Sequence, residues 1–305
     1  MKKYKIIVNP IAGHGAGERS ITQIEHLLHA HNMSYELVRT DHPWHAVDLA
    51  KEASKESNDV VVAVGGDGTS NEVLNGLVLA KQAGLGESAL GIISVGRGND
   101  FAFGFGIPTD IPTAIQSLSK DHRTRMDVGR SVGGLYPQGR YFGNGVGIGF
   151  DAVVGFEAIK LKRLHGFPSY LIAALKTIFL YYKAPRVLIE FDSQMLNLST
   201  LMISIMNGRR MGGGFMMAPF ALTDDSLFDF CIATQVSRAK IFTLMPRFMK
   251  GTQGSHPAIQ TGQTRRITIT ALEGSLPAHA DGETLCTDGD KLTIEILPRF
   301  IDIVC

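Results

Sequence analysis

A run of apolar residues that ends in glycines constrains this chain most. Residues 60–64 read Val-Val-Val-Ala-Val without polar alternation, which predicts a strand buried on both faces. The stretch Gly65–Gly68 carries Asp67 among glycines, and Thr69 then begins a pattern typical of an amphipathic helix. The N–H groups and dipole at the start of such a helix favour a phosphate. A carboxylate beside that phosphate calls for a bridging cation, so we expect a nucleotide phosphate with Mg²⁺ near Asp67. The alternative is an ordinary turn in which Asp67 caps the helix.

Strand and helix patterns alternate through the first part of the chain. Strands are expected at residues 5–8, 35–40, 60–64, 89–95 and 123–130, with helices between them. This order predicts an α/β domain over residues 1–130, built on a parallel sheet with helices on both faces. Glycine-rich loops follow the first strand, at Asn9–Gly17, and the fourth, at Gly96–Ala102. Ligands of such sheets bind beyond the carboxyl ends of the strands, where these loops are expected to lie.

The pattern changes near residue 131. Alternating polar and apolar residues predict strands at 141–148, 186–191, 200–206, 227–233, 267–271 and 291–296. Short alternating strands of this kind favour an antiparallel β-sandwich with a helical insertion. We therefore expect a second domain over residues 131–305.

Composition excludes several classes of protein. A chain of 305 residues exceeds the usual size of one core, in agreement with two domains. The formal net charge of +1 gives no overall attraction to nucleic acid, and we expect no such partner. Its 3 cysteines are odd in number and far apart, which favours a reduced, cytoplasmic setting. The longest apolar stretch, residues 170–182, contains Lys176 and is too short to span a bilayer, so any membrane contact is expected to be peripheral.

Two glycine motifs resemble those of a known superfamily. Gly-Gly-Asp-Gly-Thr-x-Asn-Glu at residues 65–72 resembles the nucleotide motif of the diacylglycerol-kinase-like lipid kinases, which are related to sphingosine kinases. NAD kinases share its Gly-Gly-Asp-Gly-Thr core. Gly-x-Gly-Asn-Asp-Phe-Ala at residues 96–102 is similar to the second lipid-kinase motif, which NAD kinases lack in this form, although Arg97 replaces the usual threonine. The resemblance implies that ATP is contacted by Asn9, Pro10, Gly13, Thr40, Gly65, Gly66, Asp67, Gly68, Thr69, Asn71, Glu72, Gly96, Arg97 and Asn99. It also implies that the last strand, residues 298–305, returns to the first domain.

The resemblance also points to catalytic carboxylates. Asp281-Gly282-Glu283 lies between two strand patterns, where Asp-Gly ordinarily forms a hairpin turn. In the lipid kinases an Asp-Gly-Glu string carries catalytic acidic residues, so the resemblance assigns Asp281 and Glu283 jointly to accept the proton of an alcohol. It adds Asp67 and Asp127 to the catalytic set.

A third acidic stretch, Asp224-Asp225-Ser226, has two readings. It is either a solvated acidic turn or a site for a hard cation. Bacterial lipid kinases resemble it with Asp-Asp-Gly and bind a structural Mg²⁺ there. Carried over by position, the ligands are the Asp225 carboxylate and the carbonyls of Leu222 and Leu227, with Ser226 in place of the usual glycine.

Together these motifs lead to a hypothesis about function. The resemblance implies an ATP- and Mg²⁺-dependent lipid kinase of phospholipid biosynthesis, converting diacylglycerol to phosphatidic acid. A NAD kinase and a non-catalytic nucleotide-binding regulator are the alternatives. The lipid is expected at a membrane surface that the cytoplasmic protein contacts peripherally, and a homodimer is kept as a hypothesis. Three basic and apolar stretches compete for the lipid end, at residues 160–167, 209–217 and 238–250.

Overall fold

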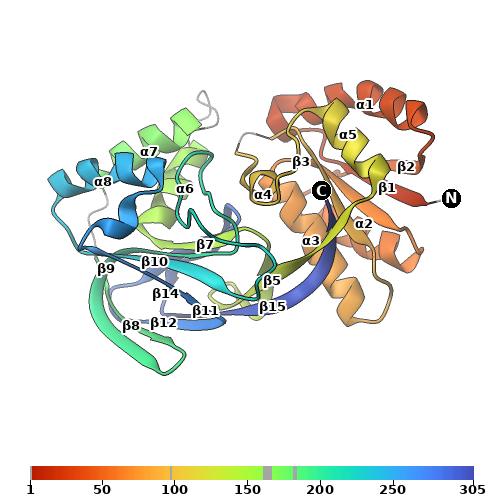
Figure 1. Cartoon of the computed structure of the whole chain (residues 1–305). Coiled ribbons are helices and arrows are strands. Elements are labelled where there is room, and N and C mark those ends of the chain that lie inside the picture. The colour runs from red at the N-terminus through yellow and green to blue at the C-terminus, as the bar shows by residue number, and fades with distance from the viewer. Residues whose placement is uncertain (1, 97, 161–166, 181–183) are drawn as a thin grey trace. The chain divides into compact units, whose positions relative to one another are not determined.

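The computed structural model describes residues 2–96, 98–160, 167–180 and 184–305 (Figure 1). The chain divides into two compact units. The first unit comprises Met1–Val128 with Pro298–Cys305, and the second comprises Gly129–Leu297. The chain passes from one unit to the other within two strands, β5 (Arg123–Gly133) and β15 (Lys291–Val304).

The first unit is built on a parallel sheet in the order β4-β3-β1-β2, with the end of β15 beside β4. These strands are β1 (Lys3–Val8), β2 (Ser34–Arg39), β3 (Val60–Gly65) and β4 (Ala89–Ser94). Every residue of β3 and β4 is buried, because helices cover both faces of the sheet (Figure 1). The helices are α1 (Ala12–Ala30), α2 (His45–Lys55), α3 (Asp67–Gln82), α4 (Asp100–Gly104) and α5 (Ile111–Lys120). The α/β fold predicted for this part of the chain is confirmed.

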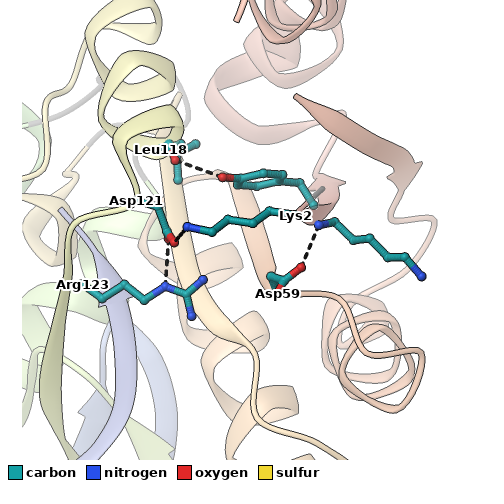
Figure 2. Close-up of polar contacts among 7 residues, drawn as sticks. Lys2, Asp59, Leu118, Asp121 and Arg123 are labelled. Carbon is teal, nitrogen blue, oxygen red and sulfur yellow. Dashed lines mark hydrogen bonds and ion pairs between the residues drawn. The ribbon is translucent and has the colours of Figure 1, made fainter. Parts of the chain in front are cut away.

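Polar contacts close the amino-terminal edge of this sheet. The backbone N–H of Lys3 donates to Asp59, which immediately precedes β3, at 2.8 Å. The carboxylate of Asp121, after α5, accepts from Arg123 Nε at 2.8 Å and pairs with Lys2 (Figure 2). The opposite edge, where the strands end, is the one that carries the glycine loops.

The second unit is an antiparallel β-sandwich, as predicted. One path of strands runs β14-β13-β7-β9-β8-β12-β15, while β10 pairs with β9 and β11, and β6 with β5. Its other strands are β6 (Tyr136–Phe142), β7 (Gly145–Gly149), β8 (Arg186–Phe191), β9 (Gln194–Met206), β10 (Phe228–Thr234), β11 (Ile259–Thr264), β12 (Arg266–Glu273), β13 (Leu276–Ala280) and β14 (Glu283–Gly289). Its helices are α6 (Phe150–Lys160), α7 (Phe167–Leu180), α8 (Arg238–Lys250) and the short 3₁₀ helix η1 (Gln253–Ser255).

The second unit has two apolar cores. One lies among the strands and is formed by residues such as Val146, Ile189 and Ile294. The other lies between the sheet and helices α6, α7 and α8, and contains residues such as Phe150 and Phe248. The helical insertion is therefore part of the folded core of this unit.

Two strand predictions are corrected by the structure. The single strand expected over residues 141–148 is wrong, because β6 ends at Phe142 and β7 begins at Gly145. The intervening Gly143 and Asn144 turn their N–H groups toward the side chain of Asp281, which a continuous strand would not allow. Conversely, residues 291–296 and 300–304 belong to one continuous strand, β15.

Candidate active site

Three loops of the first unit meet at the carboxyl edge of its sheet. Asn9, after β1, donates from Nδ2 to Oγ1 of Thr69, after β3, at 3.1 Å. Gly96, after β4, packs directly on Gly66: a Cβ at Gly96 would lie only 2.3 Å from the Cα of Gly66. The structure therefore brings together the three glycine loops that the sequence placed far apart.

The first loop touches the end of β4 as well. Gly13 has φ +56, and a Cβ there would lie 2.1 Å from the carbonyl oxygen of Val95. Gly13, His14 and Gly15 all have positive φ, so the backbone after Pro10 forms a loop before α1 becomes regular. Only a residue without a side chain fits at Gly13.

Asp67 braces the loop after β4. Helix α3 has Gly66 at its N-cap, and this glycine has no side chain with which to cap the helix. Asp67 is the next residue, and its Oδ1 accepts from the backbone N–H of Phe101 at 2.9 Å. At least one oxygen of Asp67 is therefore directed to the loop after β4. The N–H groups in the first turn of an α-helix are donors of the kind that bind phosphate.

Other residues expected to contact ATP surround this point at different depths. Gly65 ends β3, Gly68 lies in the first turn of α3, and Thr40 is buried directly after β2, where its N–H donates to the carbonyl of Val8 at 2.9 Å. Asn99, at φ +52, is the N-cap residue of α4. Arg97 lies outside the described residues.

Asn71 and Glu72 lie further along α3 and contact helices. Asn71 is fully buried and its Oδ1 accepts from Nδ2 of Asn75 at 3.2 Å. The Oε2 of Glu72 accepts from the N–H of Ala46, at the start of α2, at 3.3 Å. These two contacts are within and between helices, whereas the bond from Asn9 to Thr69 joins the first loop to the start of α3.

Asp127 lies within β5 and is completely buried. Its Oδ1 accepts from the backbone N–H of Arg299 at 2.6 Å, and Arg299 has φ +48. This bond fixes a bend in β15 at the point where that strand enters the first unit. The contact is structural, and the catalytic role suggested for Asp127 stays a prediction.

Asp281 occupies the hairpin between β13 and β14. Asp281 and Gly282 have φ of +48 and +86, so the Asp-Gly pair forms the tight turn that its sequence suggests. The buried carboxylate of Asp281 accepts three backbone N–H groups, from Gly143 at 2.8 Å, Asn144 at 3.1 Å and Gly145 at 2.8 Å. These bonds stabilise the charged form and anchor the turn to the segment between β6 and β7.

Glu283 differs from Asp281 in its surroundings. Its side chain is 44% exposed, and Oε2 lies 3.9 Å from a guanidinium nitrogen of Arg140, whose side chain is only 2% exposed. Arg140 also donates to the hydroxyl of Tyr136 at 2.6 Å. Glu283 is thus an accessible carboxylate beside a buried cation, whereas the oxygens of Asp281 already accept from the backbone.

A buried polar pair lies behind this turn. A Cβ at Gly147 would lie 2.5 Å from Oδ2 of Asp151 and 2.6 Å from Nε2 of His279, so both side chains approach the same glycine. His279 Nδ1 accepts from the N–H of Gly282 at 3.3 Å, which leaves the proton of a neutral ring on Nε2. Ser204 Oγ donates to Asp151 Oδ2 at 3.3 Å.

Burial shifts the pKa of Asp151 and of His279 in the direction that favours the uncharged form of each. It raises the pKa of Asp151 to about 6, against the hydrogen bond from Ser204. It lowers the pKa of His279 to about 4, although the charges of Asp281 and Glu283 oppose this. His279 is therefore neutral at neutral pH, in accord with a structural helper of the turn.

Asp151 also forms part of the wall of an apolar cavity. The cavity encloses about 60 Å³ between β9, β10 and helices α6, α7 and α8. Its lining consists of Phe150, Asp151, Val154, Ala174, Leu201, Met202, Phe215, Met217, Ala233, Ile241, Leu244, Met245 and Phe248. Three of these residues are methionines, whose flexible side chains adapt to varied apolar ligands.

The sequence reasoning missed Asp151, although a signal was present. Gly-Ile-Gly-Phe-Asp at residues 147–151 is a strand that runs into glycine and then an aspartate in the first turn of a helix. The same arrangement places Asp67 after β3. The tight approach of His279 to Gly147 was not readable, because it depends on the pairing of β13 with β7.

The acidic loop before β10 has a defined conformation. Asp225 Oδ1 accepts from the N–H of Leu227 at 3.0 Å, which closes a short turn. Ser226 has φ +68, a conformation that favours glycine. The loop thus keeps a glycine-like backbone without a glycine, and Leu222 is half exposed beside it.

Comparisons with known proteins identify relatives of both parts of the chain. Residues 3–131 match the diacylglycerol kinase catalytic domain, and residues 144–305 match the YegS C-terminal NAD kinase beta sandwich-like domain. The chain is 31% identical over 288 residues to a diacylglycerol kinase of Mycobacterium tuberculosis, covering 93% of this chain and 89% of that protein. A diacylglycerol kinase of Staphylococcus saprophyticus is 28% identical over 283 residues, with 92% and 89% covered.

A solved structure shares the fold. The crystal structure of a diacylglycerol kinase from Bacillus anthracis superposes with a TM-score of 0.74 at 22% identity, covering 99% of this chain and 96% of that one. Within the described ranges, no helix is both long and apolar enough to cross a bilayer.

Proposed function

The chain belongs to the diacylglycerol kinase catalytic-domain family, and from this premise we propose that it transfers the γ-phosphate of ATP to a lipid hydroxyl, that of diacylglycerol. The apolar cavity of the second unit is the observation that supports a lipid as the phosphate acceptor. A NAD kinase must bind a polar dinucleotide, whereas this cavity has one carboxyl group and otherwise apolar walls.

The loops of the first unit support ATP as the donor. Phosphoryl transfer is catalysed chiefly by positioning and by charge, so a rigid cradle for the phosphates is the main requirement. Contact between Gly66 and Gly96 leaves the start of α3 open to an anion, and Asp67 lies beside it. Mg²⁺ bound near Asp67 would neutralise charge on the phosphates.

The loop of Asp225 fits a second, structural Mg²⁺. A carboxylate and backbone carbonyls are the oxygen donors that hard cations prefer. The turn at Ser226 leaves one oxygen of Asp225 beyond its bond to Leu227, and the carbonyls of Leu222 and Leu227 would complete the protein ligands.

Glu283 is the better candidate for the base. A base needs an oxygen that can receive a proton from the substrate, and the Asp281 carboxylate already accepts three N–H groups. Asp281 instead holds the turn that presents Glu283. The exposed carboxylate of Glu283 would accept the proton of the lipid hydroxyl as that oxygen attacks the γ-phosphate.

The lipid chain would enter the cavity by displacing flexible side chains. Its volume of about 60 Å³ is too small for a long chain unless these side chains move. Methionines 202, 217 and 245 line it and can change rotamer without loss of apolar contact. Asp151, at the wall, offers a polar partner for the head of the lipid.

A pair of variants tests this assignment. Glu283→Gln should lower phosphate transfer to diacylglycerol by about 10²- to 10⁴-fold, with ATP affinity and thermal stability unchanged. Ala233→Leu should fill the cavity, lower lipid turnover and leave ATP affinity intact, while stability stays equal or rises. Met245→Leu, which conserves volume, serves as the control. Full activity in Glu283→Gln would exclude this base, and full lipid turnover in Ala233→Leu would exclude the cavity.

A further inference from the structure

Helices α7 and α8 present an exposed apolar surface on the side away from their core. The two helices lie side by side (Figure 1). Ile172 and Phe179 of α7 are 41% and 65% exposed, and Phe242 and Met249 of α8 are 39% and 40% exposed. The ring centroids of Phe179 and Phe242 lie 6.0 Å apart, and we call these four exposed residues the α7–α8 patch.

The charged side chains of these two helices have a single sign. Helix α8 carries Arg238, Lys240, Arg247 and Lys250, and neither α7 nor α8 contains an acidic residue. Lys176 of α7 pairs with Glu157 of α6 at 2.5 Å, but Glu157 also accepts from Lys160 at 2.6 Å. Two lysines therefore meet that one carboxylate, and the net charge around the patch stays positive.

The same two helices separate the apolar cavity from solvent. Ala174 of α7 and Ile241, Leu244, Met245 and Phe248 of α8 line the cavity on the inner side. The helices thus have an apolar inner face toward the cavity and an outer face that combines aromatic side chains with cations. That outer combination is typical of segments that lie in the interface of an anionic membrane.

We propose that the α7–α8 patch docks on an anionic membrane surface, with Phe179 and Phe242 inserted among the lipids and the α8 cations against their head groups. The proposal rests on the proposed function in one respect: a lipid acceptor would then leave the bilayer at the helices that cover its cavity. The occupant is a membrane because α8 carries four cations and neither helix an acidic residue, which a purely apolar contact between proteins does not require.

Vesicle sedimentation of the full chain tests the proposal. Vesicles of phosphatidylcholine with phosphatidylglycerol are compared with phosphatidylcholine alone. Phe179→Ser/Phe242→Ser should lower affinity for the anionic vesicles roughly tenfold or more, because the inserted apolar area is lost. Lys240→Gln/Lys250→Gln should also lower it by roughly tenfold, and only with the anionic vesicles. Leu135→Ser/Met195→Ser, at two positions that are each 66% exposed, should bind as the wild type does.

A second assay separates docking from catalysis. Phosphate transfer to a short-chain diacylglycerol, dispersed below the concentration at which it aggregates, should be the same in Phe179→Ser/Phe242→Ser and the wild type. Vesicle binding without any transfer would support the patch and reject the lipid kinase. Wild-type binding by the phenylalanine variant would overturn the patch. So would a wild-type dimer that this variant converts to a monomer, since a second copy would then cover the surface.

Discussion

The loops of the first unit and the turn of the second unit hold their aspartates in opposite ways. In the first, Asp67 accepts the N–H of Phe101, and the neighbouring helix begins at a glycine, Gly66, which has no side chain to cap it. In the second, three N–H groups converge on Asp281. One region therefore offers backbone donors to a ligand, whereas the other uses them to fix its own carboxylate. The comparison teaches that an aspartate in a glycine turn is a ligand site or an anchor according to where the nearby N–H groups point.

The largest effect is expected where glycine loops touch. Gly96→Val would place side-chain atoms against the Cα of Gly66, which is backbone and cannot rotate away. We expect at least about a hundredfold loss of ATP affinity by calorimetry. Gly84→Ala is the control, because φ is positive there too, at +67, but nothing lies within 4 Å. Equal ATP affinity in the two variants would refute the convergence of the loops.

Asp281→Asn tests whether the carboxylate of Asp281 stabilises the turn of the second unit. Asparagine replaces one carboxylate oxygen by an NH₂ group, which cannot accept a hydrogen bond. At least one of the three backbone N–H groups that donate to Asp281 therefore loses its acceptor. We expect a loss of about 2–3 kcal/mol in the free energy of unfolding. Glu283→Gln should stay within about 0.5 kcal/mol of the wild type. Urea denaturation measures both, and equal stabilities would contradict the distinction drawn between the two acids.

The buried pair predicts a dependence of stability on pH. Since the folded pKa of Asp151 is raised to about 6 from 3.8, the folded state holds this proton more tightly, and stability falls as pH rises through that window. His279 acts in the opposite sense between its pKa of about 4 and 6.5, because its folded pKa is lowered.

Asp151→Asn removes only the first of these contributions. Relative to the wild type, the variant should gain stability as pH rises from about 4 to 6, by up to about 3 kcal/mol for a shift of about two units. Unfolding in urea at several pH values measures the difference between the two proteins. Parallel curves would show that Asp151 does not titrate in this range.

The smallest effect is expected at the acidic loop. Ser226 holds φ +68, and Ser226→Gly would relieve this strain at the cost of a more flexible unfolded chain. The net gain in stability should be within about 1 kcal/mol. Thermal melts with and without Mg²⁺ measure it, with Gly254→Ala as a control at a glycine whose own φ is not positive. A loss of stability would show that the serine side chain supports the loop.

The sequence predicted the first unit in more detail than the second. The first unit was predictable because its loops are short contiguous strings at the ends of buried strands, such as residues 60–69 and 96–102. The second unit was predictable as a sandwich but not in its contacts. Gly143 and Asn144 read as part of a strand, and only the pairing of β13 with β7 brings them to Asp281. The surroundings of Asp151 were not predictable either, since Ser204 of β9 bonds to it and His279 of β13 approaches the same glycine.

Transfer of labelled phosphate from ATP with Mg²⁺ tests the central claim most directly. Purified protein is offered diacylglycerol, monoacylglycerol, phosphatidylglycerol, ceramide and sphingosine in mixed micelles, and NAD in water. Label in diacylglycerol, lost in Glu283→Gln, is the predicted result. Label in NAD, or in no acceptor while ATP still binds, would contradict it.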